Sequence, residues 1–219
     1  MKSVNYARTL RALKHSLSAA TGDPSPNRWD NDKLHEPDPA PVLRILRNNA
    51  PADPLETTGN PAFDLLMQRA TPRMLYGGAP ANCYPPEYKS QPADHDCIVF
   101  PHMDAFNSPA DYRATLAHEL VHWAGAEGRT NRGSEGLDGF DRLRMQFTGV
   151  VPVGYAREEM TAEIGAAFLL DALGDDPDVD DRASYVANWA ASQPKESRAK
   201  LVDEAAKAAR VSVDYLLSL

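Results

Sequence analysis

The segment SPADYRATLAHELVHWAG, residues 108–125, decides the fold of this 219-residue chain. It contains the signals that begin and end a helix. Ser108 can cap the helix, Pro109 suits its first position, and Asp111 lies where the acid of a capping box belongs. The closing glycine can end the helix, so we expect it to span residues 109–124.

This helix carries the pattern HExxH. His118 and His122 are four residues apart and therefore share a helix face, so both imidazoles can reach a single ion. Glu119 is rotated away from them but can accept a proton from a water molecule that the ion acidifies. A helix with two surface histidines and no metal site would have the same sequence pattern. The strong helix start and an apolar opposite face favour a metal site instead, and with it a zinc-dependent hydrolase.

A catalytic zinc site needs a third protein ligand. The best candidate lies on a helix expected over residues 156–173, where Glu159 and Glu163 are four apart and share a face. One of them would bind the metal, and the other would accept the N–H of a ligand histidine. We favour Glu159 as the ligand and Glu163 as the acceptor, whereas Glu158 points off this face. Two imidazoles and a carboxylate favour Zn²⁺, and Mn²⁺ or Co²⁺ would fit as substitutes.

Two further residues are candidates for stabilising a transition state. His102 comes shortly after an apolar strand, and Tyr155 lies at the start of the second metal-bearing helix. Either side chain could donate a hydrogen bond to an oxyanion if it faces the cleft.

The remaining pattern predicts an α+β domain, with a small sheet packed on the HExxH helix and further helices towards the C-terminus. Two short strands are expected first, at residues 74–76 and 97–100. The expected helices of this part are 109–124, 156–173, 181–192 and 195–210. The glycine-rich segment 125–154 would connect the two metal-bearing helices and border the cleft.

Residues 1–70 carry no chemical motif and are interpreted as an N-terminal helical and extended arm, whereas residues 71–219 would form the domain. Helical periodicity is present over residues 3–20. A segment rich in proline follows over 22–42, and shorter helices are expected at 42–47 and 62–69.

Composition narrows the functional classes. The net charge of -8 argues against general electrostatic binding of nucleic acid, although a local basic patch would be compatible with this charge. No segment resembles a signal peptide, and no apolar run is long enough to span a membrane. The two cysteines, Cys83 and Cys97, are too few for a disulfide framework and are interpreted as reduced thiols of a cytoplasmic protein.

At the level of families, residues 111–125 and 155–168 resemble the C-terminal metallopeptidase domain of ArdC-type antirestriction proteins and phage polyvalent proteins. The resemblance extends over about residues 72–219. It implies a zincin-like fold, a divalent metal at His118, His122 and a glutamate on a later helix, and carriage on mobile DNA. Family members with the full architecture place a single-stranded-DNA-binding domain before this one, and the first 70 residues here do not match it.

Three functional hypotheses follow. The leading one is a zinc metallopeptidase that cleaves a restricted intracellular protein, whose extended chain would add to an open edge of the strand Cys97–Phe100. The second is a metal-stabilised antirestriction or interaction module that binds protein or single-stranded DNA without proteolysis, and that needs the metal but not Glu119. The third is an accessory domain left from a larger mobile-element protein.

Overall fold

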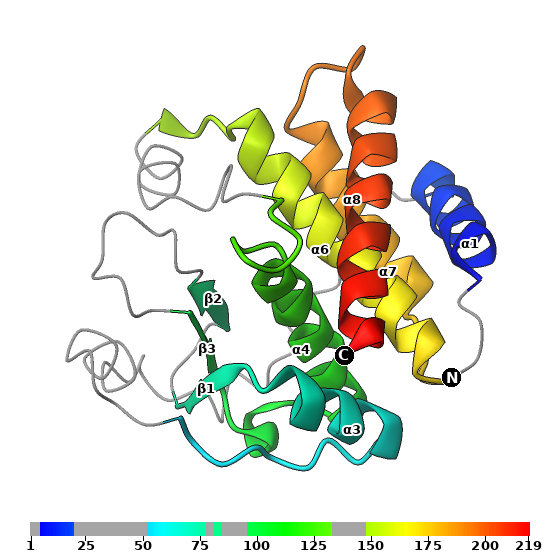
Figure 1. Ribbon diagram of the computed structural model, residues 1–219. Helices are drawn as coiled ribbons and strands as arrows, with labels where there is room; N and C mark the ends of the chain where they lie inside the picture. The colour runs from blue at the N-terminus through cyan, green and yellow to red at the C-terminus, as the bar shows by residue number, and fades with distance from the viewer. Residues whose placement is uncertain (1–4, 20–51, 78–80, 85–95, 133–147) are drawn as a thin grey trace.

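Figure 1 shows the computed structural model, which describes residues 5–19, 52–77, 81–84, 96–132 and 148–219. The N-terminal part contains α1 (Tyr6–Ala19) and α3 (Pro61–Ala70). The strands are β1 (Arg73–Tyr76), β2 (Asn82–Tyr84) and β3 (Cys97–Phe100), followed by the 3₁₀ turn η1 (Met103–Ala105). The remaining helices are α4 (Pro109–Ala124), α6 (Val153–Ala172), α7 (Val179–Ala191) and α8 (Arg198–Ser218). None of these helices is both long and apolar enough to cross a bilayer.

Helix α4 has the predicted bounds. The hydroxyl oxygen of Ser108 accepts a hydrogen bond of 3.1 Å from the backbone N–H of Asp111, which confirms the cap. Gly125 follows the helix with a φ of -72°, so it is not needed for a left-handed turn. A Cβ atom at this position would lie 2.6 Å from Nη2 of Arg132. Glycine at this position leaves the space that this guanidinium group occupies.

A three-stranded sheet in the order β1-β3-β2 packs against α4. β1 is parallel to β3, with Met74 opposite Ile98, and β2 is antiparallel to β3, with Cys83 opposite Ile98. The prediction that β3 offers an open edge to a substrate is therefore wrong, because both of its sides are paired. β2 is the edge strand on that side of the sheet. The sequence did not predict β2, because a strand of only three residues is too short to show an alternating pattern.

Helix α4 lies between the sheet and a group of helices formed by α6, α7 and α8 (Figure 1). α6 contacts all three of the other large helices of this part, α4, α7 and α8. It is buried on nearly every side from Tyr155 to Leu170, which suits its small and apolar composition. The fold is α+β, as predicted, and α6 is the helix around which it is organised.

Most predicted helix bounds agree with the structure to within a few residues. The exception is α8, which was expected to end at residue 210 and continues to Ser218. Its last two turns bury Ser212, Val213 and Leu216, so the face that packs on the rest of the core continues beyond Arg210. The predicted helix at 42–47 and the linker at 22–42 lie outside the described residues.

The described part of residues 1–70 also contributes to the core. Leu13 of α1 and Phe63 of α3 are buried in the same apolar cluster as residues of α4 and α6. α1 packs mainly on α7 and also on α6. The domain boundary near residue 70 stays a prediction, but α1 and α3 are both packed onto the core of the domain.

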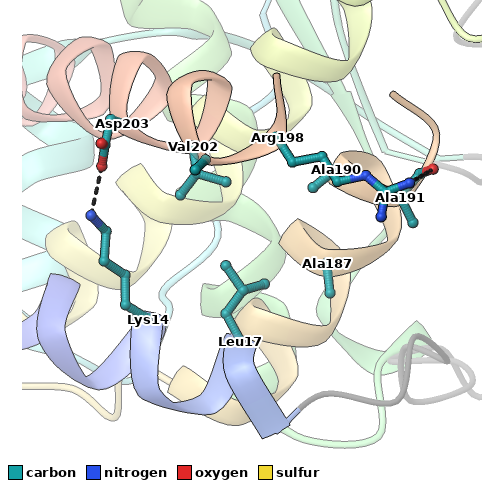
Figure 2. Close-up of a pocket in the computed structure, with 9 residues that line it drawn as sticks. Lys14, Leu17, Ala187, Ala190, Ala191, Arg198, Val202 and Asp203 are labelled. Atoms are coloured by element: carbon teal, nitrogen blue, oxygen red, sulfur yellow. Dashed lines mark hydrogen bonds and ion pairs between the residues drawn. The ribbon is translucent and has the colours of Figure 1, made fainter. Parts of the chain in front are cut away.

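A groove of about 420 Å³ lies between α1, α7 and α8 (Figure 2). Apolar side chains such as Leu17 and Val202 line it, and an ion pair of 2.6 Å between Lys14 and Asp203 lies at one side. None of the predicted site residues lines this groove. It is thus separate from the HExxH motif.

Candidate metal centre

Helices α4 and α6 bring three potential metal ligands to one point. His118, His122 and Glu159 each offer one ligand atom, and these atoms all lie within 4.8 Å of one another. His122 and Glu159 are buried, and the side chain of His118 is 13% exposed. The structure thus brings together the three residues that the sequence indicated as ligands.

The separations of these atoms suit one tetrahedral cation. The Nε2 atoms of His118 and His122 are 3.0 Å apart. Oε2 of Glu159 lies 3.4 Å from Nε2 of His118 and 3.9 Å from Nε2 of His122. Two ligand atoms at about 2.0–2.1 Å from a tetrahedral zinc ion lie about 3.3 Å apart. The donor set therefore fits a cation of this size with only small movements.

The other ring nitrogen of each histidine is held by a glutamate of α6. Nδ1 of His118 lies 3.1 Å from Oε1 of Glu163, and Nδ1 of His122 lies 2.9 Å from Oε1 of Glu158. Because the earlier histidine meets the later glutamate, α4 and α6 run in opposite directions at the site. With Nδ1–H donated to a carboxylate, the lone pair of Nε2 is available to a metal.

Glu119 follows the candidate ligand His118 in α4 and is buried, with a relative exposure of 6%. The pKa of the Cys83 thiol on β2 is raised, chiefly by burial and next by the nearby carboxylate of Glu119. This interaction places Glu119 near β2. The HExxH glutamate therefore lies close to the outer strand of the sheet.

The site residues fall within a recognisable family region. The family profile described as zincin-like metallopeptidase matches residues 87–208. The chain belongs to this family. The matched region includes α4 and α6 in full, and with them both histidines and the glutamates around them.

Relatives of this zincin-like chain include parts of longer proteins. Two DNA primases TraC of Escherichia coli are 36% and 35% identical to it over 94 residues, which is 43% of this chain and 8% and 6% of the two primases. The crystal structure of the antirestriction protein ArdC from plasmid R388, in metal-free form, is 32% identical with a TM-score of 0.48. That match covers 76% of this chain and 53% of ArdC. The chain thus spans about half of ArdC and less than a tenth of TraC.

The ionisable groups around the zincin-like site change one another's pKa. Burial alone would raise the pKa of Glu158, but Arg132 and the hydrogen bond to His122 lower it to about 2. Burial would likewise raise the pKa of Glu159, and the hydrogen bond with His118 helps to lower it instead. Burial would lower the pKa of His118, whereas Glu163 and Glu159 raise it to about 10. The carboxylates therefore favour positive charge at this point, which a divalent cation would supply.

The two candidates for transition-state stabilisation are placed differently. The side chain of Tyr155 is buried and hydrogen-bonds Glu159, which helps to lower the pKa of that carboxylate. The side chain of His102 is 57% exposed, and its Nδ1 lies 2.6 Å from Oε1 of Glu56. Its ring stacks on Tyr76 at 5.4 Å. Tyr155 therefore adjoins the ligand cluster, whereas His102 does not belong to it.

From helix periodicity Glu158 is not expected at the site, because it does not share a helix face with Glu159 and Glu163. The structure corrects this: Glu158 is buried and holds Nδ1 of His122. Adjacent residues point about 100° apart around a helix, so Glu158 and Glu159 can approach one imidazole from two sides. A single helix cannot reveal this arrangement, because it depends on how close α4 lies to α6.

Proposed function

We propose that this chain is a zinc-dependent metallopeptidase that acts in the cytoplasm on a restricted protein substrate. The observation that carries the proposal is the convergence of His118, His122 and Glu159, with all ligand atoms within 4.8 Å, beside the buried Glu119. These three residues would hold the metal. Two imidazoles and one carboxylate form the ligand set of many catalytic zinc sites, which leave a fourth position open.

Bound there, zinc would supply Lewis acidity, polarising a scissile carbonyl and making water a better nucleophile. The protein's own residues would carry the protons. Glu119 would accept a proton from the attacking water and return it to the departing amine. Tyr155, close to the ligand cluster through Glu159, would donate a hydrogen bond to the oxygen on which negative charge develops. Membership of the zincin-like family supports this assignment of roles.

The sheet suggests how a peptide would bind. In the described part of the chain, β2 has a strand partner on one side only, and it packs against α4. An extended substrate could pair with the other side of β2, since backbone groups of an edge strand accept an added strand. This position is close to Glu119, whose carboxylate influences Cys83 of the same strand.

The decisive test compares the purified wild type with Glu119→Gln and with a His118→Ala, His122→Ala double variant. We expect one zinc per chain in the wild type and in Glu119→Gln, and none in the double variant. Cleavage of a peptide library should occur only with the wild type, because Glu119 moves protons without binding the metal. Equal cleavage by Glu119→Gln would contradict the proposal.

A second function is favoured by the relatives, one of which is named an antirestriction protein and two of which are DNA primases. In this alternative the metal stabilises a module that binds protein or single-stranded DNA of mobile elements, without proteolysis. The Glu119→Gln variant separates the two functions. If protection of incoming DNA from restriction persists in Glu119→Gln but is lost in the double histidine variant, the binding module is correct.

A further inference from the structure

Each of the two HExxH histidines belongs to a chain of contacts that ends in an arginine. The first chain runs from His122 to Glu158 and on to Arg132, which follows α4 in the sequence. The second runs from His118 to Glu163 and on to Arg182 of α7. The two arginines come from different elements, yet they make the same kinds of contact.

Arg132 is positioned by several partners. Its Nε lies 2.8 Å from Oε2 of Glu158, and its Nη2 also contacts the other oxygen of this carboxylate. Nη2 further donates to the backbone carbonyl of Val121 at 2.9 Å, and Nη1 donates to the hydroxyl of Ser212 on α8. One guanidinium group therefore links the glutamate of α6 to the residue that precedes His122. This geometry uses the planar fork of arginine, which lysine lacks.

Arg182 repeats the arrangement at the other histidine. Its side chain is completely buried. Nη1 contacts Oε2 of Glu163, while Nη2 donates to the backbone carbonyl of Ala114 at 2.6 Å. Ala114 lies one helical turn before His118. This arginine too connects a glutamate of α6 to the backbone of α4 near a histidine.

The packing around Arg132 is adapted to its presence. Gly125 leaves the space that the guanidinium group occupies, since a Cβ there would lie 2.6 Å from Nη2 and 2.8 Å from Cζ. A buried charge is costly unless it is paired and hydrogen-bonded, and both arginines meet this condition through a glutamate and a backbone carbonyl.

We propose that Arg132 and Arg182 are positioning residues of the metal centre, each fixing the glutamate that orients one ligand histidine. With its carboxylate held on one side by the arginine, Glu158 or Glu163 directs the Nδ1–H of its histidine and aims Nε2 at the cation. The inference rests on the proposed metal site, but not on proteolytic activity. It adds to the three ligands an outer set of two glutamates and two arginines.

The test measures zinc affinity by competition with a chromophoric chelator, in the wild type and in Arg132→Gln. Loss of partners that orient a ligand histidine typically weakens metal binding about 10–100-fold. We expect a loss of this size in Arg132→Gln, and a changed visible absorption spectrum of the Co²⁺-loaded protein, because the direction of the imidazole changes. Arg132→Lys should recover only part of the affinity, since it retains the charge without the fork.

Arg113→Gln is the matched control. The side chains of Arg113 and Arg132 are equally buried, each with 13% exposure. Arg113 pairs with Asp175 and donates a hydrogen bond to the backbone carbonyl of Thr58. It contacts neither Glu158 nor Glu163 in the structure. Arg113→Gln should therefore lower the melting temperature of the protein without changing its zinc affinity or its Co²⁺ spectrum.

The possible results separate the two proposals. If the wild type binds no zinc, the proposal of a metal site is wrong, and so is the positioning role that depends on it. If the wild type binds zinc and the affinity of Arg132→Gln is unchanged or falls no more than that of Arg113→Gln, the metal site stands and the positioning role is overturned. Should Arg132→Gln not fold, the same comparison is made with Arg132→Lys and Glu158→Gln, which retain most of the side-chain volume. Unchanged affinity and spectrum in both would overturn the inference.

Discussion

Gly165 of α6 lies directly against Val121 of α4: a Cβ at residue 165 would be 2.8 Å from both γ-methyl groups of the valine. Val121 lies between the two histidines in α4, and Gly165 follows Glu163 by two residues in α6. This close approach brings α4 and α6 near enough for their candidate metal ligands to meet. A larger residue at either position would separate ligands that α4 and α6 must share.

The first prediction concerns this contact. Gly165→Ala should add up to about 1 kcal/mol to the free energy of unfolding, because alanine favours helix more than glycine does. Overpacking the contact with Val121 should subtract more, since overpacking a core typically costs about 1–3 kcal/mol. We expect a net loss of stability in urea unfolding, together with weaker zinc binding. In a Val121→Ala background the two contacts of 2.8 Å are removed and only the 3.3 Å contact with Cβ of residue 121 remains, so the same substitution should destabilise much less. Equal effects in both backgrounds would show that the contact does not limit the helix approach.

A second prediction separates the two candidate third ligands. Glu159→Gln should reduce zinc affinity by more than about 100-fold, because a direct ligand is lost. Glu163→Gln should reduce it by about 10–100-fold, the range typical of a group that orients a ligand. Glu56→Gln, whose partner is His102, serves as the control and should bind zinc as the wild type does. A stronger effect of Glu163→Gln than of Glu159→Gln would exchange their roles.

The third prediction is a pH dependence of stability from the ion pair of Arg113 and Asp175, which joins α4 to the end of α6. Burial would raise the pKa of Asp175, but its hydrogen bond with Arg113 lowers it below the ordinary value of 3.8. The pair therefore stabilises the fold above pH 3.8 and loses this effect as the pH falls through the lowered pKa.

Asp175→Asn removes that titration. Thermal unfolding between pH 6 and pH 2.5 should show the variant less stable than the wild type at pH 6, with the difference shrinking as the solution becomes acidic. A constant difference over this range would mean that the charge of Asp175 is not the source of its contribution.

The fourth prediction tests the unexpected end of α8. Deleting residues 211–219 removes the buried Val213 and Leu216, and burial of such side chains is typically worth about 1.5–3 kcal/mol each. It also removes Ser212, a partner of Arg132. We expect a loss of several kcal/mol in urea unfolding. Deletion of residues 218–219 alone is the control and should have little effect, because both residues are exposed.

Local patterns alone determined much of this protein. The cap at Ser108 and the HExxH spacing defined α4 and two candidate ligands, because neighbours on a helix are related by a fixed period. The same period placed Glu159 and Glu163 on one face of α6. The strand Cys97–Phe100 was evident from its short apolar run. These features depend on residues within one or two turns of each other, so sequence spacing is enough to find them.

Tertiary structure alone decided the rest, because it brings together residues that are far apart in the chain. β2 pairs with β3 across 12 or more intervening residues and closes the edge that the sequence left open to a substrate. Glu158 became a partner of His122, and Arg132 and Arg182 became partners of glutamates, only through the close packing of α4, α6 and α7. Buried charges need partners, and which partners they find depends on the distances between elements, which no local pattern contains.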